Sequence, residues 1–114
     1  MKNINSLRKN SEFQLVYRRG KSFANKYLVM YVMENGREDL RIGISVSKKV
    51  GNSVVRHRVT RLIRESYRLN KDMFRTGLDI IVVARPAAKD LKYDKIESAY
   101  LHLGRLHNIL EESK

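Results

Sequence analysis

The residues best suited to chemistry in this chain lie between Lys48 and Arg68, and the chemistry that they suit is anion binding. The stretch holds seven lysines and arginines against one carboxylate, Glu65. From residue 56 onward, all of these cations are arginine. Arginine pairs with phosphate through two hydrogen bonds and is less strongly hydrated than lysine. Since clustered arginines repel one another unless an anion neutralises them, the stretch predicts a binding site for RNA or DNA.

The same residues have the spacing of an amphipathic helix. At about 100° per residue, we expect a helix from the N-cap Asn52 to Asn70, with one face in the core. The apolar face consists of Val55, Val59, Leu62, Ile63 and Leu69, and the basic face of His57, Arg61, Arg64 and Arg68, with Arg56 at its border. Lys48 and Lys49 extend the basic surface onto the loop before the helix, whose N-terminal N–H groups also bind phosphate. A solvated charged face is the plainer interpretation, but the exclusive use of arginine favours a bound polyanion.

No group of residues in the sequence has the spacing of a catalytic centre. The histidines are His57, His102 and His107, and the last two, five residues apart, cannot share a metal as an i, i+4 pair does. The carboxylates are scattered, the serines lie outside any triad pattern, and there is no cysteine for a thiolate site. We therefore expect no catalytic residue and no bound metal or cofactor in this chain, and we expect a partner to perform any reaction.

Length and charge place these residues in one small basic domain. With 114 residues, 42% of them hydrophobic, the chain is expected to fold as a single domain over 1–114 despite its net charge of +12. Such a charge attracts nucleic acid or an anionic membrane surface. The apolar runs 27–33 and 80–84 are too short to span a bilayer, and residues 1–6 lack the apolar stretch of a signal peptide. We expect a cytoplasmic protein with no membrane contact.

Two further helices are expected on either side of the basic one. A short helix follows the N-cap Asn10 or Ser11, with Gly20 as a left-handed residue at its end. Its core positions recur at helical spacing in Phe13, Val16 and Tyr17. A closing helix beyond Asp90 is marked by Ile96, Ala99, Tyr100, Leu103, Leu106 and Leu110.

Three segments have the pattern of strands. Residues 27–33 and 41–47 alternate, with a turn at Asn35-Gly36 between them, and the run 79–85 is expected to be buried on both faces. In the second strand Ile42, Ile44 and Val46 should meet the helices, which leaves the side around Ser45 open unless the first helix covers it. The resulting order is helix, two strands, helix, strand, helix, in a single α/β sandwich. The general rule makes its strand–helix–strand crossover right-handed in about 98% of cases.

Three aromatic residues have two interpretations that the sequence leaves open. Phe13, Tyr17 and Tyr31 have the spacing of core residues, which is the commoner role of such aromatics. Tyr31, however, shares its sheet face with Arg41 and Ser45, a basic and polar surrounding in which aromatic rings stack on unpaired bases. A core contact and a stacking surface remain alternatives.

The motif from Lys48 to Arg58, followed by Arg61, Arg64 and Arg68, resembles the signature of the bacterial ribonuclease P protein subunit. Segments 10–17, 20–22, 41–47 and 80–87 resemble the same family in the same order, so the resemblance covers about the whole chain. It implies an α+β fold of order α-β-β-β-α-β-α, an α/β sandwich with a left-handed β-α-β crossover that is similar to domain 2 of ribosomal protein S5. We adopt this left-handed crossover in place of the general rule.

The resemblance implies a ribonucleoprotein endoribonuclease that removes the 5′ leader of precursor tRNA. The RNA subunit would hold the Mg²⁺ ions and cut the substrate, while the protein binds that RNA and the leader, broadens the substrate range and needs no obligate protein partner. The positions implied for the RNA subunit are Lys48, Lys49, Asn52, Arg56, His57, Arg58, Arg61, Arg64 and Arg68. Those implied for the leader-binding cleft are Phe13, Tyr17, Val29, Tyr31 and Ser45.

One residue departs from the family motif. The family usually has asparagine where this chain has His57. Histidine keeps a donor and an acceptor at that position of the basic face. We therefore expect the RNA contact to persist with a different hydrogen-bond pattern.

Three alternatives share parts of this pattern. A structural rRNA-binding protein would have the same charge and a similar fold without a role in tRNA processing. A basic helix could dock on anionic membranes, but its apolar face would then have to be free. A protein nuclease would cut RNA without any RNA partner.

Overall fold

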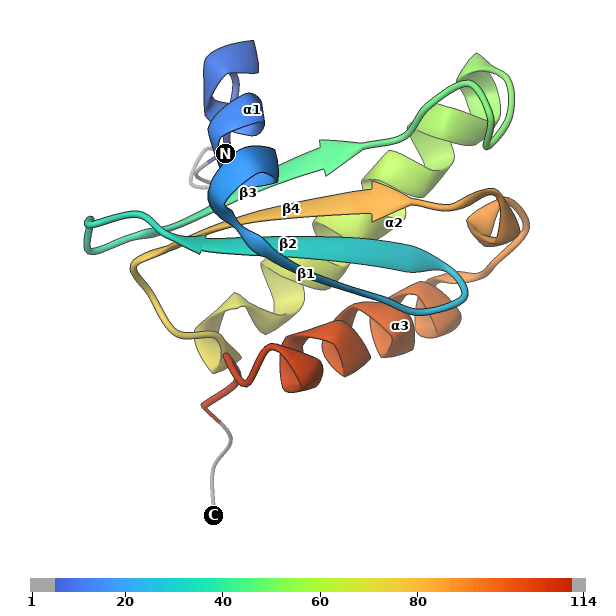
Figure 1. Ribbon diagram of the computed structural model, residues 1–114. Helices are drawn as coiled ribbons and strands as arrows, with labels where there is room; N and C mark the ends of the chain where they lie inside the picture. Colours follow the sequence, from blue (N-terminus) through green and yellow to red (C-terminus); the bar gives the residue numbers. More distant parts are fainter. Residues whose placement is uncertain (1–5, 112–114) are drawn as a thin grey trace.

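The computed structural model describes residues 6–111 as three helices against one mixed sheet (Figure 1). The elements, in chain order, are α1 (Asn10–Arg19), β1 (Lys21–Ala24), β2 (Leu28–Glu34), β3 (Leu40–Ser45), α2 (Ser53–Asn70), the 3-10 turn η1 (Lys71–Met73), β4 (Leu78–Ala84), the 3-10 turn η2 (Pro86–Ala88) and α3 (Tyr93–Leu106). The order α-β-β-β-α-β-α that the resemblance implies is thereby confirmed. Over the described residues, no helix is both long and apolar enough to cross a membrane.

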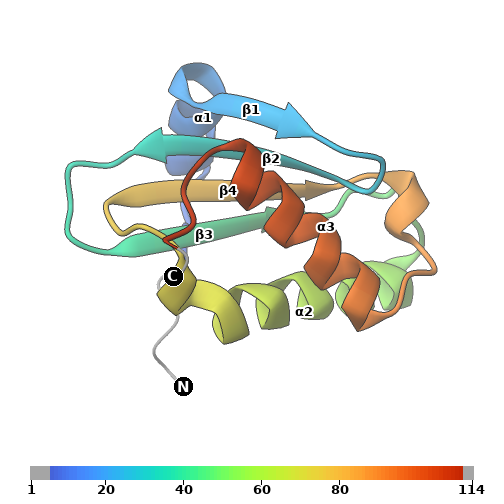
Figure 2. The ribbon, with the colours of Figure 1, turned by 90° about the horizontal axis from the view of Figure 1, so that it is seen from below.

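The sheet has the strand order β1-β2-β4-β3. β2 pairs with β1 and with β4 in antiparallel register, whereas β3 runs parallel to β4. Seen from the helix side, β3 and β4 both run from left to right and β4 lies above β3 (Figure 2), which makes the β3–α2–β4 crossover left-handed. The resemblance therefore predicted the handedness correctly, and the general rule did not.

The main core lies between the sheet and the two long helices. Figures 1 and 2 show α2 and α3 on the same face of the sheet. Met30, Ile42 and Ile80 point into this layer and are fully or almost fully buried, as are Ile63 and Tyr100 from the helices. β4 is buried on both faces, as its unbroken apolar run predicted.

A smaller core lies under α1 on the opposite face of the sheet (Figure 1). Leu7, Val16 and Ile81 are buried there. The ring of Phe13 lies so close to β3 that a Cβ at Gly43 would come within 2.6 Å of it. Glycine at this position is therefore what allows the helix to lie flat on the strand.

A charged network fixes α1 to the sheet. The Arg41 guanidinium donates to Asp79 on the neighbouring strand through Nε to Oδ1 at 2.8 Å and Nη2 to Oδ2 at 2.7 Å. Its Nη1 donates to Glu12 of α1 at 3.2 Å. The Asp79 carboxylate is only 2% exposed and accepts a further hydrogen bond from Asn35. The pairing with Asp79 is bidentate, and it holds the pKa of Arg41 above its usual range through the hydrogen bonds that the guanidinium donates to Asp79.

Several element ends differ from the sequence-based expectations. The N-cap of α1 is Lys9, one residue before Asn10, because Glu12 accepts hydrogen bonds from the N–H groups of Arg8 and Lys9. Gly20 has φ −78°, so the expected left-handed residue is wrong. Its lack of a Cβ is needed for another reason, since a Cβ there would lie 2.6 Å from the Val16 carbonyl oxygen.

Two leucines assigned to buried helix faces are exposed. Leu69 is 55% exposed in the last turn of α2, and Leu106 is 43% exposed at the end of α3. Leu110 lies beyond α3, where it forms a bridge with Phe74. The apolar face of α2 is completed instead by Ser66 and Tyr67, which are buried.

Replacing Asp79 tests the charged network. We expect Asp79→Asn to lower the free energy of unfolding by about 3 kcal/mol, because it leaves the Arg41 charge without its buried partner. Urea denaturation measures this, and Glu38→Gln, which removes an exposed carboxylate, is the control with an expected change within about 0.5 kcal/mol. Equal stabilities of the two variants would contradict a structural role for the network.

Candidate nucleic-acid interface

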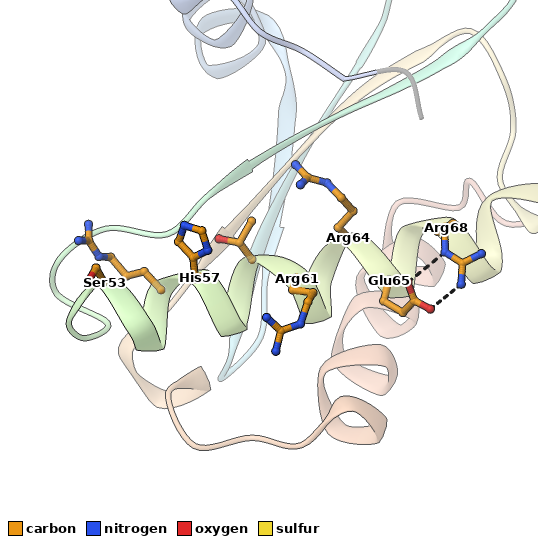
Figure 3. A pocket seen from close by; sticks show the side chains of 8 residues that line it. Ser53, His57, Arg61, Arg64, Glu65 and Arg68 are labelled. Atoms are coloured by element: carbon orange, nitrogen blue, oxygen red, sulfur yellow. Dashed lines mark hydrogen bonds and ion pairs between the residues drawn. The ribbon is translucent and has the colours of Figure 1, made fainter. Parts of the chain in front are cut away.

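The exposed face of α2 forms an open groove of about 730 Å³. Its first turn is fixed by Asn52, whose Oδ1 accepts a hydrogen bond from the Val55 N–H at 3.0 Å. Figure 3 shows His57, Arg61 and Arg64 projecting from successive turns of the helix. The groove is lined by Ser53, Arg56, His57, Thr60, Arg61, Arg64, Glu65 and Arg68. The spacing of the basic face is thereby confirmed.

The arginines of this groove differ in what they bind. Arg68 is paired with Glu65 through Nε to Oε1 at 3.0 Å, which holds the pKa of the carboxyl below its usual range (Figure 3). Across residues 6–111, no salt bridge involves Arg56, Arg61 or Arg64. The Nε of Arg56 is buried and has no hydrogen-bond partner among the described residues. The guanidinium groups of Arg61 and Arg64, which have no carboxylate partner among the described residues, can therefore pair with an anion in the groove.

The remaining basic positions lie outside this groove. Arg58 donates to the carbonyl oxygen of Leu91 through Nη2 at 2.5 Å and to that of Lys89 through Nη1 at 3.4 Å. This side chain therefore ties α2 to the segment before α3, and its contact with RNA stays a prediction. Lys48 and Lys49 are exposed on the loop before α2 and do not line the groove.

Two hydroxyl residues of the groove were missed from the sequence. Ser53 and Thr60 line it together with the arginines. The signal was available, because Thr60 lies four residues after Arg56 and four before Arg64, on the same helical stripe. Their hydroxyls add uncharged donors to a face otherwise described by its charge alone.

A second surface lies beside α1 on the other face of the sheet. The rings of Tyr17 and Tyr31 meet edge to face at 4.9 Å, and those of Phe13 and Tyr17 lie 6.4 Å apart. All three are only partly buried, and they pack against the small core under α1. They are therefore core contacts that keep some exposed surface, and base stacking on that surface stays a prediction.

The strand register shows how this surface continues along the sheet beyond α1. Tyr31, Ile81 and Gly43 face one another across three strands under α1. In the next row Val29, Val83 and Ser45 are paired in the same way and are all partly exposed. The predicted cleft residues are thus neighbours, and Val83 joins them. The sequence did not reveal Val83 because its role depends on β4 lying between β2 and β3.

The other histidines lie apart from both surfaces. His107 is half-buried, with its Nε2 2.9 Å from the Met30 carbonyl oxygen, and its burial lowers its pKa. His102 lies near Asn25 at the surface. Among residues 6–111, no three histidine, cysteine or carboxylate side chains come together as metal ligands.

Known proteins match the chain over nearly its whole length. The family model of ribonuclease P matches residues 1–107. The ribonuclease P protein component of Lachnoclostridium phytofermentans is 59% identical over 109 residues, which cover 96% of this chain and 94% of the relative. That of Alkaliphilus oremlandii is 52% identical and covers 99% of both chains.

Solved structures agree with the sequence matches. The RNase P protein of Staphylococcus aureus superposes with a TM-score of 0.87 at 37% identity, covering 95% of this chain and 99% of the other. That of Thermotoga maritima has a TM-score of 0.81 at 31% identity, covering 89% and 96%. Both the sequence and the fold are therefore similar to one and the same family.

Glu12 makes the position of α1 sensitive to acid. The backbone N–H groups of Lys9 and Arg8 lower the pKa of this carboxyl, and the Arg41 charge adds to the effect. A carboxyl whose pKa is lowered in the folded state contributes its full stabilisation when the pH is above the ordinary pKa of 4.5. This contribution is lost as the pH falls through the lowered pKa. We expect Glu12→Gln, which keeps an acceptor for the N-cap, to lose less stability than the natural chain below pH 4.5. Urea midpoints from pH 7 to 3 measure this, and parallel curves for the two proteins would contradict it.

Proposed function

The chain belongs to the ribonuclease P protein family, and we propose that it binds the catalytic RNA subunit through α2 and the 5′ leader of precursor tRNA through the cleft beside α1. As a ribonuclease P protein component, it is a subunit of a ribonucleoprotein endoribonuclease of tRNA processing, with an RNA partner. The proposal concerns which surface meets which RNA. The compartment that we propose is the cytoplasm.

The observation that carries the proposal is the unpaired charge on α2. Three arginines of one groove have no carboxylate partner among the described residues, and one of them has a buried Nε without an acceptor. Phosphate oxygens pair bidentately with guanidinium groups that lack a carboxylate partner. The apolar face of the helix lies in the core, since Val59 and Ile63 are fully buried, and this argues against insertion into a membrane.

The cleft suits a single strand better than a duplex. Exposed aromatic surface at Tyr17 and Tyr31 offers faces and edges to unpaired bases, which a base-paired stem would not present. The row formed by Val29, Val83 and Ser45 adds an apolar floor with one hydroxyl. The leader is the single-stranded part of precursor tRNA, and it is therefore the segment that we assign to this cleft.

The chemistry of the cut belongs, in this proposal, to the RNA subunit and its Mg²⁺ ions. The protein contributes binding and orientation, and it binds no cofactor of its own. Reconstitution with a bacterial ribonuclease P RNA and a precursor-tRNA cleavage assay at low Mg²⁺ tests this division. Cleavage by the purified protein alone would make it a nuclease, and binding to a ribosomal RNA fragment without any effect on cleavage would favour a structural rRNA-binding protein.

Arg64→Ala tests the α2 groove. We expect weaker binding to the RNA subunit, with the slope of log K against log salt reduced in magnitude by about 0.9, because one phosphate contact is lost. Filter binding or fluorescence titration across a salt series measures the slope. Arg75→Ala removes an exposed arginine outside the groove and should leave the slope unchanged. An unchanged slope for Arg64→Ala would count against the assignment.

Tyr17→Ala tests the cleft. We expect it to weaken binding of leader-containing precursor tRNA to the reconstituted enzyme by about 1–3 kcal/mol, the contribution of one stacked base, and to leave mature tRNA unaffected. Tyr17→Phe keeps the ring and is the matched control, with near-natural affinity for both RNAs. Equal losses for precursor and mature tRNA would remove the leader from this site.

A further inference from the structure

A second basic groove lies at the edge of the sheet that is farthest from β3. It has a volume of about 370 Å³ and runs between the β1–β2 turn, residues 25–27, and the exposed side of α3 at Lys95, Ser98, Ala99 and His102. Since β1 and β3 are the two edge strands, and α2 packs beneath β3, this groove is separate from the arginine groove on α2 (Figure 2). Nothing in the function proposed above uses it.

Asn25 builds the groove by joining the turn to α3. Its Oδ1 accepts hydrogen bonds from the N–H groups of Tyr27 at 3.1 Å and Leu28 at 2.9 Å, so the amide nitrogen is the atom that faces α3. That nitrogen donates to the Ala99 carbonyl oxygen at 3.0 Å and lies 3.1 Å from Nδ1 of His102. His102 therefore accepts at Nδ1 and carries its hydrogen on Nε2. One N–H donor of the imidazole is left for a ligand.

The lining of this groove suits a ligand that combines an anionic group with a planar aromatic one. Lys26 and Lys95 provide two ammonium groups, and no carboxylate is among the lining residues. Tyr27 provides an aromatic ring, and the Lys26 Nζ lies 5.7 Å from its centre. Arg85, which donates to the Asn25 carbonyl oxygen at 2.8 Å, adds a third cation beside the turn. Cations around an aromatic ring are the elements that bind single-stranded nucleic acid.

The turn connects this groove directly to the cleft beside α1. Ala24, the last residue of β1, is the register partner of Val29 in the cleft floor, and the turn that lines the groove joins these two strands. A single-stranded RNA that leaves the cleft across this edge of the sheet would pass next to the turn. Figure 1 shows the turn and the first half of α3 at the same end of the molecule.

We propose that this groove binds the distal part of the single-stranded 5′ leader after it leaves the cleft. Lys26, Lys95 and the Nε2–H of His102 would hold a phosphate, and Tyr27 would stack on the adjoining base. This binding rests on the function proposed above, because the leader reaches the groove only by way of the cleft. It makes the affinity of the enzyme for precursor tRNA depend on leader length.

The test uses reconstituted holoenzyme and precursor tRNAs whose leaders are lengthened one nucleotide at a time. We expect the affinity of the natural protein to rise once the leader passes the cleft, and K26A/K95A to lose that increment. For long leaders only, the double variant should also reduce the magnitude of the salt slope by about 1.4, the value for two contacts to a single strand. R75A/K89A removes two exposed charges outside the groove and should behave like the natural protein.

Tyr27 is tested by a pair of variants that both keep an apolar contact with the core. Tyr27→Leu should lose about fivefold or more in affinity for long leaders, the lower end of the effect of one stacked base, whereas Tyr27→Phe should keep it. Circular dichroism and thermal melting check that each variant is folded. Equal affinities of the two variants for long leaders would overturn the stacking role.

The outcomes separate the groove from the function on which it rests. The groove assignment fails if K26A/K95A binds long leaders like the natural protein, or loses the same factor for every leader length and for mature tRNA. Weaker binding of this variant to the RNA subunit alone would assign the groove to that RNA and also overturn the proposal. If Tyr17→Ala too shows no leader-dependent loss, the cleft itself is wrong.

Discussion

The structure depends on a bridge made by one guanidinium group. Arg41 joins Asp79 on the inner strand β4 to Glu12 on α1, and so ties the short helix to one part of the second sheet face. Because α1 covers the row at Ile81 and leaves the row at Val83 partly exposed, one part of this sheet face is core and the other part is open to a ligand. A longer helix would bury the whole face and leave no room for a ligand. The buried carboxylate of Asp79 would be costly on its own, but it accepts hydrogen bonds from Arg41 and Asn35, and Arg41 in turn contacts Glu12 on the helix.

The arginines of α2 also fall into two groups, which differ in whether the side chain already has a partner within the protein. Arg58 is bound to backbone carbonyls of the segment before α3, and Arg68 to Glu65 of its own helix, so both already have a partner within the protein. Arg56 and Arg64 line the groove without a salt bridge among the described residues. A count of arginines in the motif therefore overstates the charge that is available to a partner. Position on the helix decides which guanidinium groups remain for phosphate.

The sequence predicted those features that repeat along the chain. The helical period of 53–70 and the apolar run of β4 were both found, because burial on one face leaves a periodic pattern and burial on two faces leaves an unbroken apolar run. Contacts between distant residues left no such trace: Arg41 and Asp79 are 38 residues apart, and their pairing depends on the parallel register of β3 and β4. β1 was missing from the residue pattern because four residues are too few to show alternation. Leu69 was misassigned because the helical period does not reveal where the covering element ends.

The two surfaces that we propose for RNA lie on opposite faces of one sheet, and this geometry bears on how a small protein could influence a cut made by its RNA partner. α2 packs against one face and α1 against the other, with β4 buried between them (Figure 1). A folded core of this kind is close-packed, so the spacing between the two surfaces is fixed. In the function that we propose, binding of the RNA subunit on one face would hold the cleft in a constant position relative to that RNA. A leader bound in the cleft would then have a raised effective concentration at the cutting site, and the protein would need no catalytic group of its own for this effect.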